Sequence, residues 1–114
     1  MIRVVYRWTV ERPRADAFVA AWWEATRYIQ QGCPGAHGSF LLKSTLEADV
    51  YIAVARWDSL EAWQRGRDAA PVVPADIIEA MSSAVSGSSY EIFDEILDWA
   101  AQGANEPARK GPPP

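Results

Sequence analysis

The opening segment of the chain alternates between two sets of side chains, as a β-strand does. From residue 2 to residue 11 the even positions are apolar or aromatic, whereas the odd positions mix arginine, valine, threonine and glutamate. The even set predicts a face that packs on helices, and it comprises Ile2, Val4, Tyr6, Trp8 and Val10. The odd set, with Arg3, Val5 and Arg7, predicts a face that meets another subunit.

A helical period follows this strand. Arg12-Pro13-Arg14 ends the alternation, because proline cannot donate to a sheet ladder but suits the first turn of a helix. Over residues 15–31, apolar side chains recur at steps of four, three and four at Phe18, Trp22, Ala25 and Ile29. Gly32-Cys33-Pro34-Gly35 then predicts a turn.

The middle of the chain predicts a β-hairpin. Strands are expected over residues 36–46 and 50–57, with a short polar connection between them. In the later strand one face carries Tyr51, Ala53, Ala55 and Trp57, and the other carries Val50, Ile52, Val54 and Arg56. The first of these faces is expected to lie under the helices.

Two helices and a strand complete the expected fold. Asp58 and Glu61 form a capping-box pattern for a helix that ends before Pro71, and a further helix is expected over residues 74–85. The sequence Gly87-Ser88-Ser89 predicts a turn before a last strand over residues 90–97. The order β-α-β-β-α-(α)-β is that of a ferredoxin-like α+β domain with a four-stranded antiparallel sheet. Residues 1–99 form this domain, and residues 100–114, rich in proline and glycine, predict a disordered tail.

Composition narrows the class of protein. The net charge is −4 and no basic run exceeds two residues, which argues against nucleic-acid binding. No apolar stretch approaches the ~18 residues of a membrane span. Cys33 is the only cysteine, which we interpret as a partly buried loop thiol, and one histidine with one cysteine does not predict a metal site. A cytoplasmic location is expected.

Three local patterns give the chain a resemblance to a known family. They are the opening strand Val4–Val10 running into a proline turn, the Gly32-Cys33-Pro34-Gly35 turn before a long strand, and the segment Ala55–Trp63. Together they resemble the antibiotic biosynthesis monooxygenase family over about residues 2–97. The resemblance implies a homodimer in which two sheets meet as a dimeric α+β barrel. It also implies a cavity between sheet and helices, and, in some members, oxidation of aromatic polyketides by molecular oxygen without metal, haem or flavin.

Such chemistry requires a dry, aromatic-lined pocket with a few hydrogen-bond donors. We expect the substrate-binding walls to include Trp8, Trp22, Trp57 and Trp63. Ala53 and Ala55 would leave room between them. The competing interpretation is a packed core in which the same rings fill the space.

Candidate catalytic residues are few. His37, the only histidine, could accept a proton from a phenol, or it could be an exposed residue at the end of a strand. Tyr6 and Tyr51 could donate hydrogen bonds to a substrate oxygen, or each could bond the backbone in the core. Arg7 could hold a substrate anion, although a salt bridge or a dimer contact is favoured.

Haem-degrading members of the family differ from this chain at their key positions. They carry an asparagine on the first strand, a tryptophan late in the second helix and a histidine further on. The corresponding positions here hold Tyr6, Gly66 and Asp76, so no cofactor is expected. The favoured function is a cofactor-independent monooxygenase acting on a small aromatic or polyketide-like substrate. The alternatives are a polyketide cyclase or isomerase on the same fold, and a non-catalytic dimeric binding or accessory protein.

Overall fold

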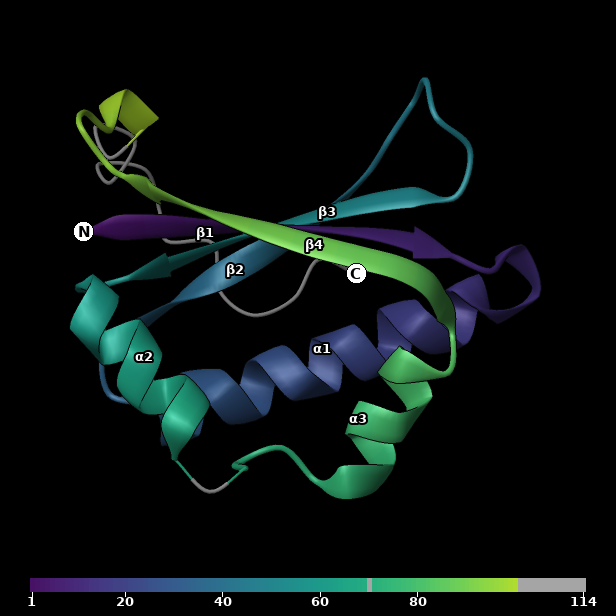
Figure 1. Ribbon diagram of the computed structural model, residues 1–114, viewed down its shortest axis with the longest axis horizontal. Helices are drawn as coiled ribbons and strands as arrows, with labels where there is room; N and C mark the ends of the chain where they lie inside the picture. The colour runs from purple at the N-terminus through teal and green to yellow at the C-terminus, as the bar shows by residue number, and fades with distance from the viewer. Residues whose placement is uncertain (70, 101–114) are drawn as a thin grey trace.

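The computed structural model describes residues 1–69 and 71–100 and has three helices on one face of a four-stranded sheet (Figure 1). All strand pairs are antiparallel, and the strand order is β2-β3-β1-β4. The elements are β1 (Ile2–Val10), η1 (Arg12–Arg14), α1 (Ala15–Gly32), β2 (Ala36–Lys43), β3 (Val50–Trp57), α2 (Leu60–Asp68), α3 (Ala75–Ser82) and β4 (Val85–Asp94). The ferredoxin-like α+β prediction is confirmed. The predicted tail, apart from residue 100, lies outside the described residues.

The two faces of β1 lie as the alternation predicted, with the even-numbered residues towards the helices. Ile2, Val4 and Val10 on its helix-facing side are at most 5% exposed. β1 is a central strand: it pairs with β3 on one side and with β4 on the other. No helix within the described residues is long and apolar enough to cross a membrane.

Helix α1 packs on the sheet through the predicted stripe. Phe18, Trp22 and Ala25 are buried, and Ala21 joins them between the turns. Phe18 is fully buried, with its ring centroid 5.3 Å from that of Trp8 and 5.6 Å from that of Tyr51. These edge and tilted ring contacts fix the helix against β1 and β3.

Strand β4 begins earlier than its sequence indicated. The Gly87-Ser88-Ser89 segment is not a turn, because its residues pair with Thr9, Trp8 and Arg7 of β1. The chain reverses instead at the end of α3, where the Ala84 N–H donates to the Met81 carbonyl. An edge strand tolerates small polar residues, since the ladder with β1 satisfies the backbone regardless of side chain. Val85, the last residue of the helix expected over residues 74–85, therefore belongs to β4, and α3 ends at Ser82.

Two further boundaries differ from expectation. β2 ends at Lys43, because the Ser44 hydroxyl accepts hydrogen bonds from the Leu46 and Glu47 N–H groups and holds a turn. Helix α2 is capped by Ser59, not Asp58: the Ser59 hydroxyl accepts from the Ala62 N–H at 3.0 Å. The Asp58 carboxylate instead bonds His37.

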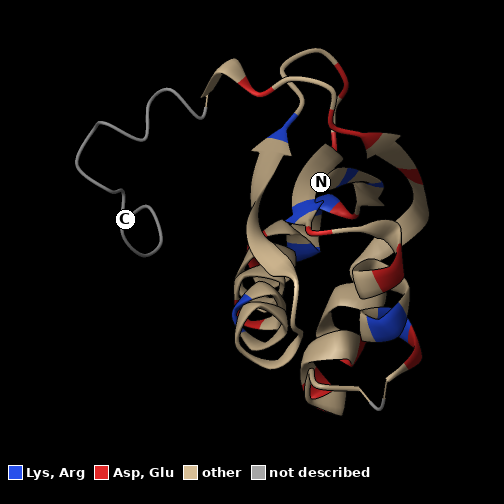
Figure 2. Ribbon diagram, turned by 90° about the vertical axis from the view of Figure 1, so that its left-hand side faces the viewer, with Lys and Arg blue, Asp and Glu red and all other residues tan. Residues whose placement is uncertain are grey.

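The outer face of the sheet carries a charge cluster near the N-terminus, where blue and red segments lie close together (Figure 2). Arg3 and Arg56 stand opposite each other across β1 and β3, a repulsive arrangement on its own. Glu95 neutralises it by accepting from both arginines, at 2.7 Å and 2.8 Å, and Asp98 adds a contact of 3.1 Å to Arg3. These contacts hold the segment after β4 against the sheet.

Beside this cluster, the outer face exposes several large apolar side chains. Phe40 and Leu42 of β2 are each 49% exposed, and Phe93 of β4 is 45% exposed. Between them lie the half-buried side chains of Val5, Ile52 and Val54, which the strand register sets next to Phe40 and Leu42. Arg7, on the same face, forms an ion pair with Glu47.

We predict that two glycines beside β2 differ in their tolerance of alanine. Gly35 and Gly38 have similar positive φ angles, +92° and +95°, so both substitutions cost about 1–2 kcal/mol of backbone strain. A Cβ at Gly35 would lie 2.8 Å from the Ala62 Cβ, whereas at Gly38 the nearest atom is 3.8 Å away. Gly35→Ala should therefore lose about 1–3 kcal/mol more stability than Gly38→Ala in urea unfolding. Equal losses would show that packing against α2 is not tight.

We also predict that Glu95 makes stability depend on pH. Its hydrogen bonds to Arg56 and Arg3 lower the pKa of Glu95 from 4.5 to about 2. A depressed pKa in the folded state gives stability that is present above the ordinary pKa and is lost as pH falls towards 2. The difference in unfolding free energy between the natural protein and Glu95→Gln should therefore shrink as the pH falls from neutral. Glu91→Gln, whose carboxylate has no ion pair in the described part of the chain, is the control.

Candidate functional site

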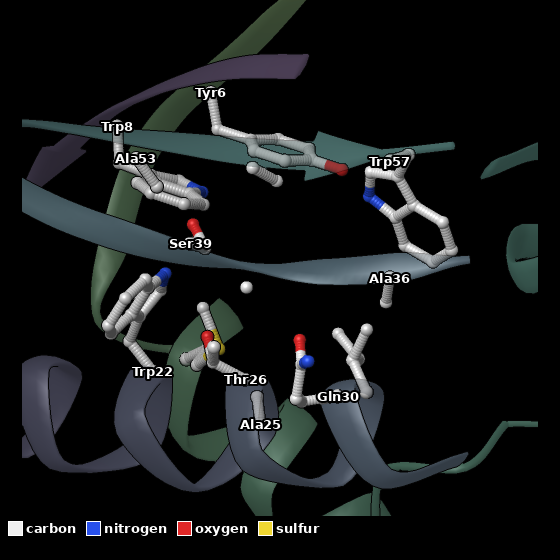
Figure 3. A pocket seen from close by; sticks show the side chains of 14 residues that line it. Tyr6, Trp8, Trp22, Ala25, Thr26, Gln30, Ala36, Ser39, Ala53 and Trp57 are labelled. Carbon is white, nitrogen blue, oxygen red and sulfur yellow. The ribbon is translucent and has the colours of Figure 1, made fainter. Parts of the chain in front are cut away.

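An apolar pocket of about 250 Å³ lies between the sheet and α1 (Figure 3). Its walls come from β1, β2 and β3 above and from α1 and α3 below. The lining residues are Tyr6, Trp8, Trp22, Ala25, Thr26, Ile29, Gln30, Ala36, Gly38, Ser39, Ala53, Ala55, Trp57 and Met81. The volume is slightly below the ~300–1,000 Å³ typical of sites for drug-sized ligands, which suits a small aromatic molecule.

The pocket exists because small residues of β3 face large residues of β1. The strand register sets Tyr6 opposite Ala53 and Val4 opposite Ala55. Both alanines line the pocket, as the sequence predicted, and the neighbouring rings do not fill the space between them and α1. The aromatic residues therefore form walls around a space and do not merely pack a solid core.

Two stacked rings form the ceiling of the pocket. Tyr6 and Trp8, two residues apart on one face of β1, lie with centroids 5.6 Å apart and planes 9° from parallel. Trp22 faces them from α1, and Trp57 closes the far end (Figure 3). This set of flat, rigid surfaces can hold a planar ring by stacking.

Polar side chains enter the pocket from α1 and β2. Thr26 and Gln30 follow Trp22 on α1 at steps of four and point into the space, as does Ser39 from β2 (Figure 3). Within residues 1–69 and 71–100, none of these three side chains has a hydrogen-bond partner. Their donors and acceptors are thus available to a ligand.

The Tyr6 hydroxyl is oriented by a hydrogen bond from α2. The Trp63 Nε1–H donates to the Tyr6 Oη at 3.2 Å. Because an indole N–H can only donate, Tyr6 must accept there, which leaves its own proton for another acceptor. Burial raises the pKa of Tyr6 above its ordinary value of 10.0, although the Trp63 bond and the Arg67 charge act the other way. At neutral pH this phenol is therefore a hydrogen-bond donor and not a base.

Two further hollows adjoin the pocket at Tyr6. One, of about 300 Å³, lies between α2 and the end of α1 and includes Cys33 and Trp63 in its lining. The other, of about 450 Å³, opens beside β4 and includes Trp63, Arg67 and Tyr90. Tyr6 lines all three spaces. The buried Cys33 thiol has a pKa raised by desolvation, so it is an inert part of this wall.

The structure brings together most, but not all, of the residues that the sequence singled out. Tyr6 lines the pocket together with the expected wall residues Trp8, Trp22 and Trp57, and Trp63 stands behind it. Tyr51 is buried against Phe18 and is not a lining residue of any of the three hollows.

His37 and Arg7 lie outside these hollows. His37 is exposed, and its Nε2 is 2.5 Å from the Asp58 Oδ1. Arg7 is on the outer face, paired with Glu47, as the salt-bridge interpretation expected. Within the described part of the chain, no group of three or more His, Cys, Asp or Glu side chains could hold a metal ion.

Several site residues were not identified from the sequence. Thr26 and Gln30 share the period of Trp22, so their spacing on the helix was a usable signal. Tyr90 and Ser88 were missed because the glycine-serine segment before Tyr90 was interpreted as a turn. Arg67 was not identified either, because nothing in the sequence indicated that it would lie on the rings of Trp63 and Tyr90.

Solved structures share this fold. The chain superposes with a TM-score of 0.71 on SnoaB, a cofactor-independent oxygenase from Streptomyces nogalater, at 18% identity, covering 86% of this chain and 95% of that one. For a protein of Caulobacter crescentus in the antibiotic biosynthesis monooxygenase group, the TM-score is 0.72 and the identity 21%, over 84% and 90% of the two chains. A protein of the same group from Bordetella bronchiseptica gives 0.72 and 18%, over 84% and 97%.

The family assignment rests on sequence. No curated protein matches the chain. The family model described as antibiotic biosynthesis monooxygenase matches residues 1–71, from β1 through α2, which is more than half of the chain. This range includes the paired Tyr6 and Trp63, the alanines of β3 and the tryptophan-lined part of α1. The chain therefore belongs to the antibiotic biosynthesis monooxygenase family.

Proposed function

We propose that this protein is a cofactor-independent monooxygenase that oxidises a small aromatic or polyketide-like substrate in the pocket between the sheet and α1. The observation that carries the proposal is the Tyr6 hydroxyl, which accepts from Trp63 and keeps its proton for a ligand inside a tryptophan-lined space. Family membership and the fold shared with SnoaB, a cofactor-independent oxygenase, support the same chemistry.

The reaction converts an activated CH₂ group into a carbonyl. The substrate anion transfers one electron to O₂, and the two radicals combine to form a C–O bond. The resulting peroxide takes up a proton and loses water as the second C–H bond and the O–O bond break. One oxygen atom enters the substrate and the other leaves as water, and the substrate supplies all the electrons.

The protein's residues contribute position and polarity to this sequence. Tyr6 donates a hydrogen bond to the oxygen on which the substrate's negative charge is delocalised. The rings of Trp8, Trp22 and Trp57 hold the substrate plane and exclude water from the reactive intermediates. Thr26 and Gln30 can bond a second oxygen of the substrate.

The lining also restricts the substrate. Among its fourteen residues there is no carboxylate and no histidine, so the described pocket contains no conventional general base. The substrate must therefore be acidic enough to ionise readily, as are phenols and CH₂ groups flanked by a carbonyl and aromatic rings. Anthrone-like phenols fit this description.

We predict oxygen uptake when the protein is given a panel of anthrone-like phenols, measured with an oxygen electrode. Tyr6→Phe should lower kcat/KM about 10²-fold, because it removes the donor to the developing anion. Tyr28→Phe, which removes a hydroxyl that lies outside all three hollows, is the matched control and should be unaffected.

Other outcomes favour the alternatives. A product formed without oxygen uptake identifies a cyclase or isomerase, and ligand binding without turnover identifies a binding protein. Oxygen uptake that Tyr6→Phe leaves unchanged would contradict the role given to this hydroxyl.

We further propose that two copies of the chain pair through the outer face of the sheet. Phe40 and Leu42 of β2 would otherwise expose an apolar surface together with Ile52, Val54 and Val5. The neighbouring arginines Arg3 and Arg56 are already neutralised within the chain, whereas Glu91, opposite Val5 on β4, has no such partner among the described residues and must stay in solvent at the margin of the interface. A twofold interface is the commonest way to cover such a face.

Sedimentation should therefore show a species of twice the 12.6 kDa chain mass at micromolar concentration. Leu42→Glu places a charge in the proposed interface and should yield monomers. Leu46→Glu makes the same change at a 94%-exposed position in the loop after β2 and should leave the dimer intact. A natural protein that sediments as a monomer would contradict the pairing.

A further inference from the structure

The hollow beside β4 contains a cation with no carboxylate partner. Arg67, in the last turn of α2, forms no ion pair with any residue of the described ranges. Its guanidinium carbon lies 4.8 Å from the centre of the Trp63 ring and 5.5 Å from that of Tyr90. Its Nη1 donates to the Tyr90 Oη at 3.2 Å. The guanidinium is thus held in place by rings and a hydroxyl, with four of its five N–H donors left over.

The two tyrosines of this hollow have protons to donate. Tyr90 accepts from Arg67, and Tyr6 accepts from Trp63. An arginine and an indole can only donate, so each phenol keeps its own O–H for a further acceptor. Among the described residues no such acceptor is bonded to either hydroxyl. The two rings, on paired residues of β1 and β4, have centroids 6.1 Å apart.

The hollow therefore has a positive charge and hydrogen-bond donors but no acidic side chain in its lining. It has a volume of about 450 Å³ and is lined by Tyr6, Trp8, Trp63, Arg67, Ser88, Ser89 and Tyr90. None of these residues is acidic. Guanidinium and phenol O–H groups that face one space are the donors that a carboxylate accepts from.

We propose that this hollow is an anion subsite that binds a carboxylate on an aromatic ligand, with Arg67 as the residue that selects for it. The subsite rests on the proposed function in one respect. The Tyr6 hydroxyl gives its one proton to the substrate in the pocket beside α1, and the Tyr6 ring, which lines both spaces, contacts the carboxylate-bearing molecule, so Arg67 and Tyr90 supply the donors of the subsite. The substrate class narrows accordingly to aromatic acids whose carboxylate faces β4.

The test compares two probes, 1-hydroxy-2-naphthoate and its methyl ester, by isothermal titration calorimetry; the ester lacks the negative charge and carries one additional methyl group. The natural protein should bind the carboxylate more tightly than the ester. Arg67→Gln should weaken carboxylate binding about tenfold or more, because a charged hydrogen bond is lost, and should change ester binding less than about twofold. Arg67→Lys keeps the charge and should lose less.

Arg65→Gln is the matched control, since it removes the same charge from an exposed position two residues away on α2. The subsite would be overturned if Arg65→Gln and Arg67→Gln lost the same affinity for the carboxylate, or if Arg67→Gln lost the same affinity for both probes. A natural protein that binds the two probes equally tightly would overturn it as well. Thermal unfolding of each variant verifies its fold. Binding is measured without turnover, so a failure to consume oxygen contradicts the monooxygenase proposal alone, whereas oxygen uptake by a protein that does not prefer the carboxylate contradicts the subsite alone.

Discussion

The pairing of β1 with β3 determines where space is left inside this domain. It sets the large side chains of the central strand against the small ones of its neighbour, Tyr6 against Ala53 and Trp8 beside them. A shift of the register by one residue would turn the alanines outward and bring Ile52 and Val54 under the helices. The tightly packed ends of the sheet, around Phe18 and around Trp57, hold that register in place. The site is thus a gap in an otherwise packed layer.

Helix α2 controls the polarity of that gap. Gly66 lets the helix approach the Trp57 ring, since a Cβ there would lie 2.9 Å from its nearest carbon. The close approach brings Trp63 within reach of the Tyr6 hydroxyl and places Arg67 over the rings of Trp63 and Tyr90. The position of this one short helix therefore determines where most of the hydrogen-bond donors of the site lie.

The sequence predicted the fold well where periodicity was strong. The alternation of β1, the stripe of α1 and the faces of β3 all appear as expected, because burial of apolar side chains dictates them. The predictions were wrong where tertiary contacts overrode the conformation that the local residue types favour. Gly87-Ser88-Ser89 has the composition of a turn, yet pairing with β1 makes it a strand. For the site, the alanines and tryptophans were predictable, whereas Arg67 and Tyr90 were not, because their meeting depends on how α2 sits over β4.

One side chain separates three neighbouring spaces, and this has a thermodynamic consequence. Tyr6 is a shared wall, so a molecule that displaces its ring on one side alters the volume available on the other two. Occupancies of adjoining chambers are then linked, and by reciprocity each occupant must change the affinity of the other by the same factor. A molecule bound in one chamber would in this way strengthen or weaken the binding of a second molecule in another.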